Sequence, residues 1–152
     1  MSNLDLFKIA QIDLVYRHKV KASERPRITH SEDAAKLFRE NWDDLTINLC
    51  EEFKLILLNR NNRVLGLSKI SQGGVTGTVV DPKIIFGLAL KSLATGIILA
   101  HNHPSGNTKP SRPDINITKK LVNAGDILEI NIIDHIILTE DSHFSFADNC
   151  ML

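Results

Sequence analysis

Two histidines and one carboxylate lie close together in the sequence, between His101 and Asp114. The apolar run at 96–100 predicts a buried strand. Residues two apart on a strand point to the same face, so His101 and His103 would direct their rings to the same side. The Pro-Ser-Gly sequence at 104–106 then turns the chain. This turn allows the carboxylate of Asp114 to come back toward the two rings.

Two imidazoles and one carboxylate form a ligand set that binds Zn²⁺ and leaves the fourth tetrahedral position for water. An open position is typical of catalytic zinc, whereas structural zinc sites are closed by four protein ligands. We therefore expect one Zn²⁺ per chain, with His101, His103 and Asp114 as its ligands.

Each of these residues also has a simpler interpretation. His101 and His103 can be ordinary residues at the end of a strand. The spacing from Ser111 to Asp114 also fits a capping box, in which Asp114 would accept a hydrogen bond at a helix start. Ser111 can be the N-cap of that helix, or its hydroxyl can face a substrate. A hydrolase also needs a general base, but with 18 acidic residues the spacing alone does not select one.

Other metal-dependent or nucleic-acid enzymes are excluded by the residues that they require. The sequence has no H-E-x-x-H helix and no H-x-E with P-C-x-x-C. A chain of 152 residues is too short for eight β/α units. The letters HNH at 101–103 match the name of a nuclease family by accident, because that name describes dispersed residues.

The composition predicts an ordinary globular domain. Hydrophobic residues make up 43% and charged residues 24% of the 152 residues. Lys plus Arg and Asp plus Glu are 18 each, and this balance argues against a dedicated nucleic-acid binder. The two cysteines form no C-x-x-C pair. No signal-peptide pattern and no membrane-length apolar run is present, so we expect a cytoplasmic protein.

Strand and helix patterns alternate along the chain, which predicts a single α/β domain with a mixed sheet flanked by helices. A capping-box spacing begins at Thr29, Asp81 and Pro82 suit a helix start, and Gly96 can end that second helix. The expected strands are 12–16, 53–58, 64–70, 96–100, 130–138 and 143–147, with a short extended segment at 77–80, and the expected helices are 29–41, 82–94 and 115–124.

The histidine stretch resembles a known motif. His101-x-His103-Pro104, followed after six residues by Ser111-x-x-Asp114, resembles the JAMM motif of the Jab/MPN metalloprotease superfamily. The sequence from Ile98 to Gly106 resembles the bacterial RadC-like branch of this superfamily. The same resemblance covers nearly the whole chain and includes Asn62-Arg63-Val64, Val80-Asp81-Pro82, Asp134-His135 and Ser145-Phe146-Ala147-Asp148.

This resemblance implies a fold and assigns roles to residues. It implies a cytidine deaminase-like α/β sandwich at 29–152, with 1–28 a strand and a basic connecting segment of the same unit. His101, His103 and Asp114 match the zinc ligands, and Ser111 matches the serine that steadies the oxyanion.

Glu51 matches the catalytic glutamate, which stands two residues before an aromatic at a strand start. Glu51 and Glu52 would point to opposite faces of an extended chain, so only one can reach the metal. His135, next to Asp134 in an apolar strand, suits a core or supporting role better than ligation.

The function implied is a zinc-dependent hydrolase of amide or isopeptide bonds, a JAMM-type metallopeptidase acting on a peptide or isopeptide substrate. One alternative is a DNA repair or recombination accessory without proteolytic activity, supported only by the basic segment 17–27 and by Lys119-Lys120. Longer RadC proteins carry a helix-hairpin-helix element that this chain lacks, so we expect weak, salt-sensitive DNA binding at most. A further alternative is an interaction module that binds metal without catalysis.

Overall fold

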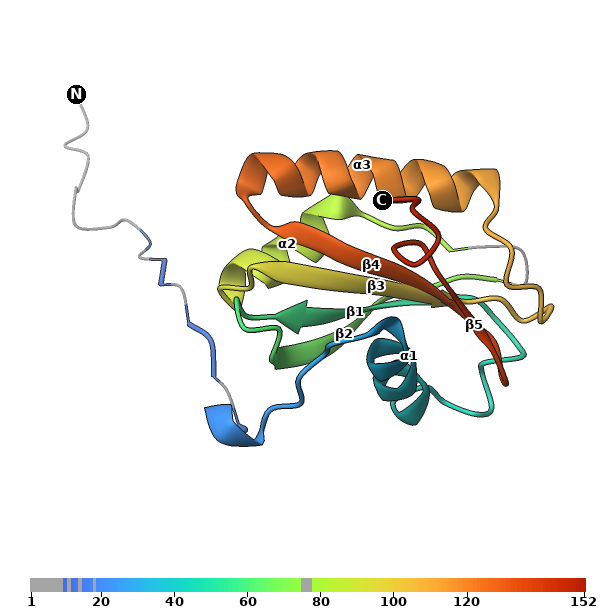
Figure 1. Cartoon of the computed structure of the whole chain (residues 1–152). Coiled ribbons are helices and arrows are strands. Elements are labelled where there is room, and N and C mark those ends of the chain that lie inside the picture. The colour runs from blue at the N-terminus through green and yellow to red at the C-terminus, as the bar shows by residue number, and fades with distance from the viewer. Residues whose placement is uncertain (1–9, 11, 14, 18, 75–77) are drawn as a thin grey trace, which may run out of the picture.

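The structure, a computed structural model, describes residues 10, 12–13, 15–17, 19–74 and 78–152, and in them a five-stranded mixed sheet lies between helices (Figure 1). The strand order is β2-β1-β3-β4-β5. The strands are β1 (Glu52–Leu58), β2 (Val64–Gln72), β3 (Gly96–Asn102), β4 (Asn131–Leu138) and β5 (His143–Ser145), and the helices are α1 (Ser31–Glu40), α2 (Pro82–Lys91) and α3 (Arg112–Leu128), preceded by a 3-10 turn, η1 (Ala22–Glu24). None of the helices in these residues is long and apolar enough to cross a membrane.

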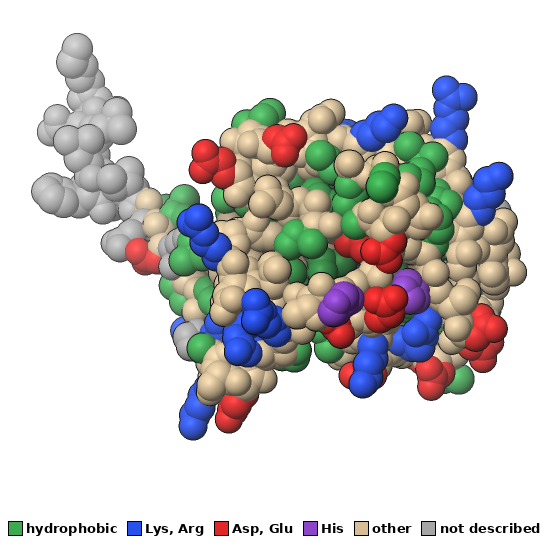
Figure 2. Space-filling model, in the orientation of Figure 1, with side chains coloured by type: hydrophobic (Ala, Val, Ile, Leu, Met, Phe, Trp, Pro, Cys, Tyr) green, Lys and Arg blue, Asp and Glu red, His purple; other side chains and the backbone are tan. Residues whose placement is uncertain are grey.

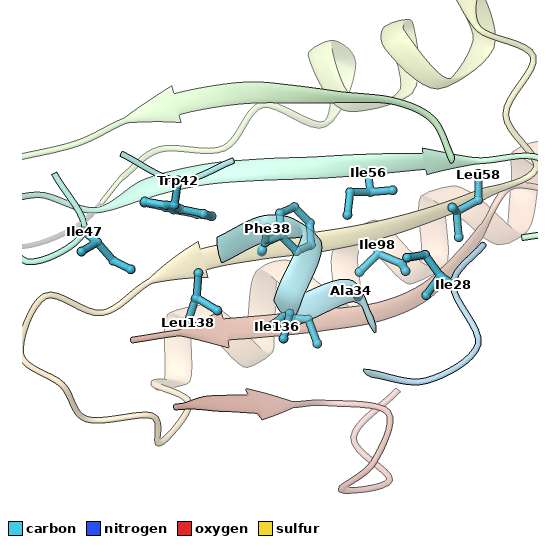
Figure 3. Close-up of a cluster of buried hydrophobic side chains, with 12 residues drawn as sticks. Ile28, Ala34, Phe38, Trp42, Ile47, Ile56, Leu58, Ile98, Ile136 and Leu138 are labelled. Atoms are coloured by element: carbon cyan, nitrogen blue, oxygen red, sulfur yellow. The ribbon is translucent and has the colours of Figure 1, made fainter. Parts of the chain in front are cut away.

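The central strands β1 and β3 are buried along their whole length, because helices cover both faces of the sheet. Alternate residues of these strands belong to two separate cores. One core packs against α1 and includes Phe38, Ile56 and Ile98, together with Trp42, which follows that helix (Figure 3). The other packs against α2 and α3 and includes Leu99. This arrangement confirms the predicted α/β sandwich.

The pairing of β3 decides which segments meet at its carboxyl end. β3 runs parallel to β4, and the connection between them contains α3. A parallel pair needs such a crossover, so α3 begins near the end where β3 finishes. On its other side β3 is antiparallel to β1, with Phe53 opposite His101. The start of β1, the end of β3 and the start of α3 therefore lie together.

The start of α1 differs from the expected capping box by one residue. Asp33, not Glu32, supplies the capping carboxylate: its Oδ2 accepts hydrogen bonds from the amides of Thr29 and His30 at 2.9 and 3.0 Å. The Thr29 hydroxyl also donates to this oxygen, and together these bonds lower the pKa of Asp33 to about 2. The helix consequently begins at Ser31, two residues later than predicted.

Two helix ends also differ, because residues other than glycine take the left-handed conformation there. α2 ends at Lys91. Two residues later Leu93 takes the left-handed conformation, with φ of 56°, and Gly96 begins β3 instead of ending the helix. α3 starts earlier and ends later than the predicted 115–124, and it continues through Gly125 to a left-handed Glu129. The predicted end of α2 at 94 was therefore too late, because Gly96 was taken as its terminator, and the predicted end of α3 at 124 was too early.

The strand expected at 12–16 was wrong for the residues of that range that the structure describes, 12, 13, 15 and 16, which have no regular secondary structure. Ile12 is 93% exposed, so the alternation does not reflect a buried face. The Tyr16 hydroxyl instead donates to the Leu65 carbonyl oxygen at 2.5 Å. Of the extended segment at 77–80, Gly77 lies outside the described residues, and the remainder is not a strand.

Two helical glycines allow a test of why α3 continues through Gly125. A Cβ at Gly125 would collide with the Ile130 carbonyl oxygen, whereas a Cβ at Gly87 in α2 would have no atom within 4 Å. We expect Gly125→Ala to lower the free energy of unfolding by about 1–3 kcal/mol, the usual scale for overpacking. Gly87→Ala should instead raise it, by about 0.5–1 kcal/mol. Urea unfolding of both variants checks this, and equal effects would contradict the close approach.

Candidate metal centre

His101, His103 and Asp114 come together at the carboxyl end of β3. The Nε2 atoms of His101 and His103 are 2.9 Å apart. Asp114 Oδ1 lies 3.2 Å from His101 Nε2, and Asp114 Oδ2 lies 3.5 Å from His103 Nε2. Among the described residues, this is the one group of three or more His, Cys, Asp or Glu side chains arranged to hold a metal ion.

The separations of these atoms fit a tetrahedral zinc ion. Ligand atoms about 2.0–2.1 Å from zinc in a tetrahedral arrangement lie about 3.3 Å from one another. The Nε2–Nε2 distance of 2.9 Å is of this order, as are the distances of 3.2 Å from His101 Nε2 to Asp114 Oδ1 and of 3.5 Å from His103 Nε2 to Asp114 Oδ2. One ligand atom from each residue lies within 4.8 Å of the other two. The donor set of two imidazole nitrogens and one carboxylate is also a set that catalytic zinc uses. The residues present therefore fit the ion that the sequence predicted.

Asp114 also caps α3, and this role is compatible with its predicted role as a ligand. Its Oδ2 accepts a hydrogen bond from the Ser111 amide at 2.7 Å, and the Ser111 hydroxyl accepts one from the Asp114 amide at 3.2 Å. This is the predicted capping box, and it leaves Oδ1 directed at His101. Burial raises the pKa of Asp114, but the electrostatic contacts with His101 and His103 outweigh it and hold this pKa well below its usual range.

His103 is oriented by the turn that follows it. Its Nδ1 lies 2.6 Å from the carbonyl oxygen of Asn107. A carbonyl oxygen only accepts hydrogen bonds, so Nδ1 carries the proton and donates it. The other ring nitrogen, Nε2, is then directed at His101 and Asp114. The hydrogen bond with Asp114 raises the pKa of His103 against the opposing effect of burial, and the charge of Glu51 adds to the rise.

His101 is held from behind by His135. The Nδ1 of His101 lies 2.8 Å from Nε2 of His135, and Nδ1 of His135 lies 2.6 Å from the Thr118 hydroxyl. His135 is fully buried and its ring stacks on Phe146. Burial lowers its pKa well below the usual value, so the ring is neutral. The sequence predicted a core or supporting role for His135, but it did not single out Thr118, which is on α3 four residues after Asp114.

Glu51 and Glu52 lie on opposite sides of the chain. Glu51 immediately precedes β1 and lines one cavity with His101 and Asp114 and another with His103 and Asp114. Glu52 is only 2% exposed, and its carboxylate oxygens lie 3.4 Å from the ammonium groups of both Lys54 and Lys69. The two carboxylates therefore have different surroundings, and only that of Glu51 faces the candidate ligands.

Asn102, between the two histidines, fixes the segment that carries Glu51. Its side-chain oxygen accepts from the Glu52 amide at 2.7 Å, and its amide group donates to the carbonyl oxygens of Ile47 and Cys50 at 2.7 and 2.8 Å. Sequence reasoning missed this role. The available signal was a polar residue inside an apolar strand, pointing away from the histidine face.

Two adjoining cavities meet at the candidate ligands. One, of about 230 Å³, has an apolar wall, and the other, of about 420 Å³, has a polar one. Glu51 and Asp114 belong to both. The apolar wall consists of Phe53, Val80, Pro113 and Ile117, and the polar wall of His103, Ser105, Asn107, Lys109 and Ser111. A substrate chain that crosses the candidate metal would therefore meet an apolar pocket on one side and hydrogen-bonding groups on the other.

The sandwich and its sheet-end histidines and carboxylate define a JAB-type domain, and comparison with known proteins gives the family. A profile of the RadC-like JAB domain matches residues 28–151. A UPF0758 protein of Flavobacterium johnsoniae is 44% identical over 122 residues, which are 80% of this chain and 52% of that protein. A UPF0758 protein of Geotalea uraniireducens is 37% identical over 144 residues, 94% of this chain and 62% of that protein. The chain belongs to the RadC-like JAB domain family, which confirms the resemblance. It spans about half to three-fifths of the length of these relatives.

The proposed ligands can be tested by metal content and affinity. Protein purified without added metal should contain about one zinc per chain, measured by elemental analysis. Replacing both His101 and His103 with Ala should abolish binding. Asp114→Asn should sharply lower zinc affinity with little loss of stability, because asparagine can still accept the bond from the Ser111 amide. Asp126→Asn, an exposed carboxylate on the same helix, serves as the control and should bind zinc normally. Unchanged zinc affinity in Asp114→Asn would leave Asp114 a helix cap only.

Proposed function

We propose that this domain is a zinc-dependent hydrolase of amide or isopeptide bonds, of the JAMM metallopeptidase type. The observation that supports it most is the convergence of a candidate zinc-binding group, a carboxylate and a hydroxyl on one pair of cavities. The residues are His101, His103 and Asp114 as ligands, Glu51 as general base and Ser111 as a donor to the oxyanion.

A zinc ion held by the three ligands would lower the pKa of a water molecule to about 7 and polarise the substrate carbonyl. Glu51, in the wall of both cavities, takes a proton from the attacking water. The water oxygen bonds to the carbonyl carbon. The carbon–nitrogen bond then breaks, and Glu51 passes the proton to the departing amine nitrogen. The products are a carboxylic acid and an amine, so the proton and both fragments are accounted for.

Ser111 is suited to stabilise the negative charge that develops on the carbonyl oxygen. Its Oγ accepts the hydrogen bond from the Asp114 amide, so its own hydroxyl proton remains available for donation. The side chain lines the polar cavity beside His103. A hydrogen-bond donor placed where charge develops lowers the barrier more than one that binds the ground state.

The cavities favour a peptide-like substrate over a nucleic acid. An apolar pocket beside the reacting centre suits a side chain, and the polar wall suits backbone amides. The DNA-accessory alternative gains no support from the charges: the net charge is zero, and the acidic and basic side chains of the described residues are interspersed on the face in Figure 2.

The role of Glu51 can be separated from metal binding. Glu51→Gln should keep the fold and the zinc, because Glu51 is not proposed as a ligand. It should lower turnover of a peptide or isopeptide substrate about 100-fold or more, the usual scale for loss of a positioned general base. The substrate is found by screening a fluorogenic peptide library, and its hydrolysis must stop with a zinc chelator and return with zinc. Normal turnover in Glu51→Gln would rule out this role.

Two other glutamates serve as controls in the same assay. Glu32→Gln, an exposed position on α1, should change neither turnover nor stability. Glu52→Gln should lower stability, because it removes the carboxylate partner of the buried Lys54 ammonium. Its folded fraction should turn over normally. If Glu52→Gln abolished turnover and Glu51→Gln did not, the assignment would be off by one residue.

A further inference from the structure

A continuous chain of hydrogen bonds joins the first turn of α3 to the back of His101. The Thr118 hydroxyl donates to the Asp114 carbonyl oxygen at 2.6 Å. The same hydroxyl oxygen lies 2.6 Å from Nδ1 of His135, whose Nε2 lies 2.8 Å from Nδ1 of His101. The chain thus begins and ends on two of the three proposed zinc ligands, which come from different elements of the fold.

The direction of each hydrogen bond follows from how many protons each group has. The Asp114 carbonyl oxygen only accepts, so the single hydroxyl proton of Thr118 is committed to it. The Thr118 oxygen must then accept a proton from Nδ1 of His135. A neutral His135 protonated at Nδ1 has a bare Nε2, which accepts from Nδ1 of His101. A neutral His101 protonated at Nδ1 has a bare Nε2, and that atom faces His103 and Asp114.

We propose that Thr118 and His135 are positioning residues that fix His101 in the tautomer whose Nε2 can bind the metal, an inference that rests on the zinc site of the proposed function. Neither residue is a ligand. They act through His101 by supplying an acceptor behind its ring, and partners of this kind orient metal-binding histidines and raise their basicity.

The surroundings of His135 keep this arrangement in place. Its ring is fully buried, stacked on Phe146 with centroids 4.8 Å apart and tilted against Phe53 at 5.5 Å. A ring enclosed by two aromatic side chains has no solvent acceptor as an alternative to Thr118. The Phe146 amide also donates to the His135 carbonyl oxygen at 3.0 Å, so the segment after β5 holds the backbone at this point.

Both proposed histidine ligands therefore donate a hydrogen bond from Nδ1, but their acceptors differ. His103 donates from Nδ1 to the Asn107 carbonyl, a group that cannot be removed by side-chain substitution. His101 donates to His135, and the direction of that bond depends on a single hydroxyl. Loss of the Thr118 hydroxyl would let His135 take the other tautomer and donate from Nε2 to His101. The proton on His101 would then move to Nε2, the atom needed for the metal.

Three variants test this inference. Thr118→Val keeps the shape and removes the hydroxyl, and it should weaken zinc binding about 10–100-fold, the usual effect of removing such a partner. Thr118→Ser keeps the hydroxyl and should restore affinity to near the wild-type value. The matched control is Thr139→Val, which removes another buried threonine hydroxyl, one bonded within the β4–β5 turn. It should bind zinc normally. Affinities are measured by competition with a chromophoric chelator.

A second measurement does not require metal. Nitrogen-15 NMR of the histidine rings in zinc-free protein reports which nitrogen carries the proton. In the wild type and in Thr118→Ser, His135 should be protonated at Nδ1, and in Thr118→Val at Nε2. The inference is overturned if Thr118→Val binds zinc as the wild type does, if Thr139→Val weakens binding equally, or if the His135 tautomer does not change. Failure of the wild type to bind zinc would instead overturn the proposed function, while the NMR result would still decide the role of Thr118.

Discussion

The pairing of β3 with an antiparallel strand on one side and a parallel strand on the other is the constraint on which the site depends. The antiparallel partner, β1, begins where β3 ends, with Phe53 opposite His101. The parallel partner, β4, requires a crossover, and α3 supplies it. Three separate segments of the chain are thereby brought to one end of the sheet. Each contributes a different chemical group: a carboxylate before β1, the imidazoles at the end of β3, and the cap of α3.

Buried polar groups near this end are tolerated because their hydrogen-bonding capacity is used. Asp134 and His135 are neighbours on β4 and face opposite sides of the sheet. The Asp134 carboxylate accepts from the amides of His135 and Ala147 and from the Ser145 hydroxyl, which secures β5 and the turn after it. Burial raises the pKa of Asp134 despite these bonds. His135 faces α3 and supports His101. Asp134 therefore stabilises the C-terminal segment on one face of the sheet, and His135 contacts the candidate site on the other face.

Helix ends and the N-terminal segment were the parts that sequence reasoning placed least well. Asp81 before Pro82 correctly marked the start of α2, and Ser111 was correctly proposed as the cap of α3, although that helix was predicted to begin at Ile115 and begins at Arg112. Caps can be predicted because they depend on residues within a few positions of one another. The continuation of α3 through Gly125 depends on the Ile130 backbone, which lies where a side chain would be. Apolar and polar residues alternate around Ile12 as they would in a half-buried strand, although Ile12 is exposed. The local sequence does not distinguish these two cases.

The sequence by itself determined the α/β class and the family, through its alternating patterns and the spacing of His101, His103, Ser111 and Asp114. These features are local, or are set by the period of a strand, so they can be read without coordinates. Only the tertiary structure shows that Glu51 lines the cavities at the candidate ligands while Glu52 pairs with buried Lys54, and that Asp114 can cap α3 with one oxygen while the other faces His101. It alone shows the hydrogen bonds of the Asn102 and Thr118 side chains beside the site. These depend on contacts between strands and helices far apart in the chain, and spacing along the sequence carries no information about such contacts.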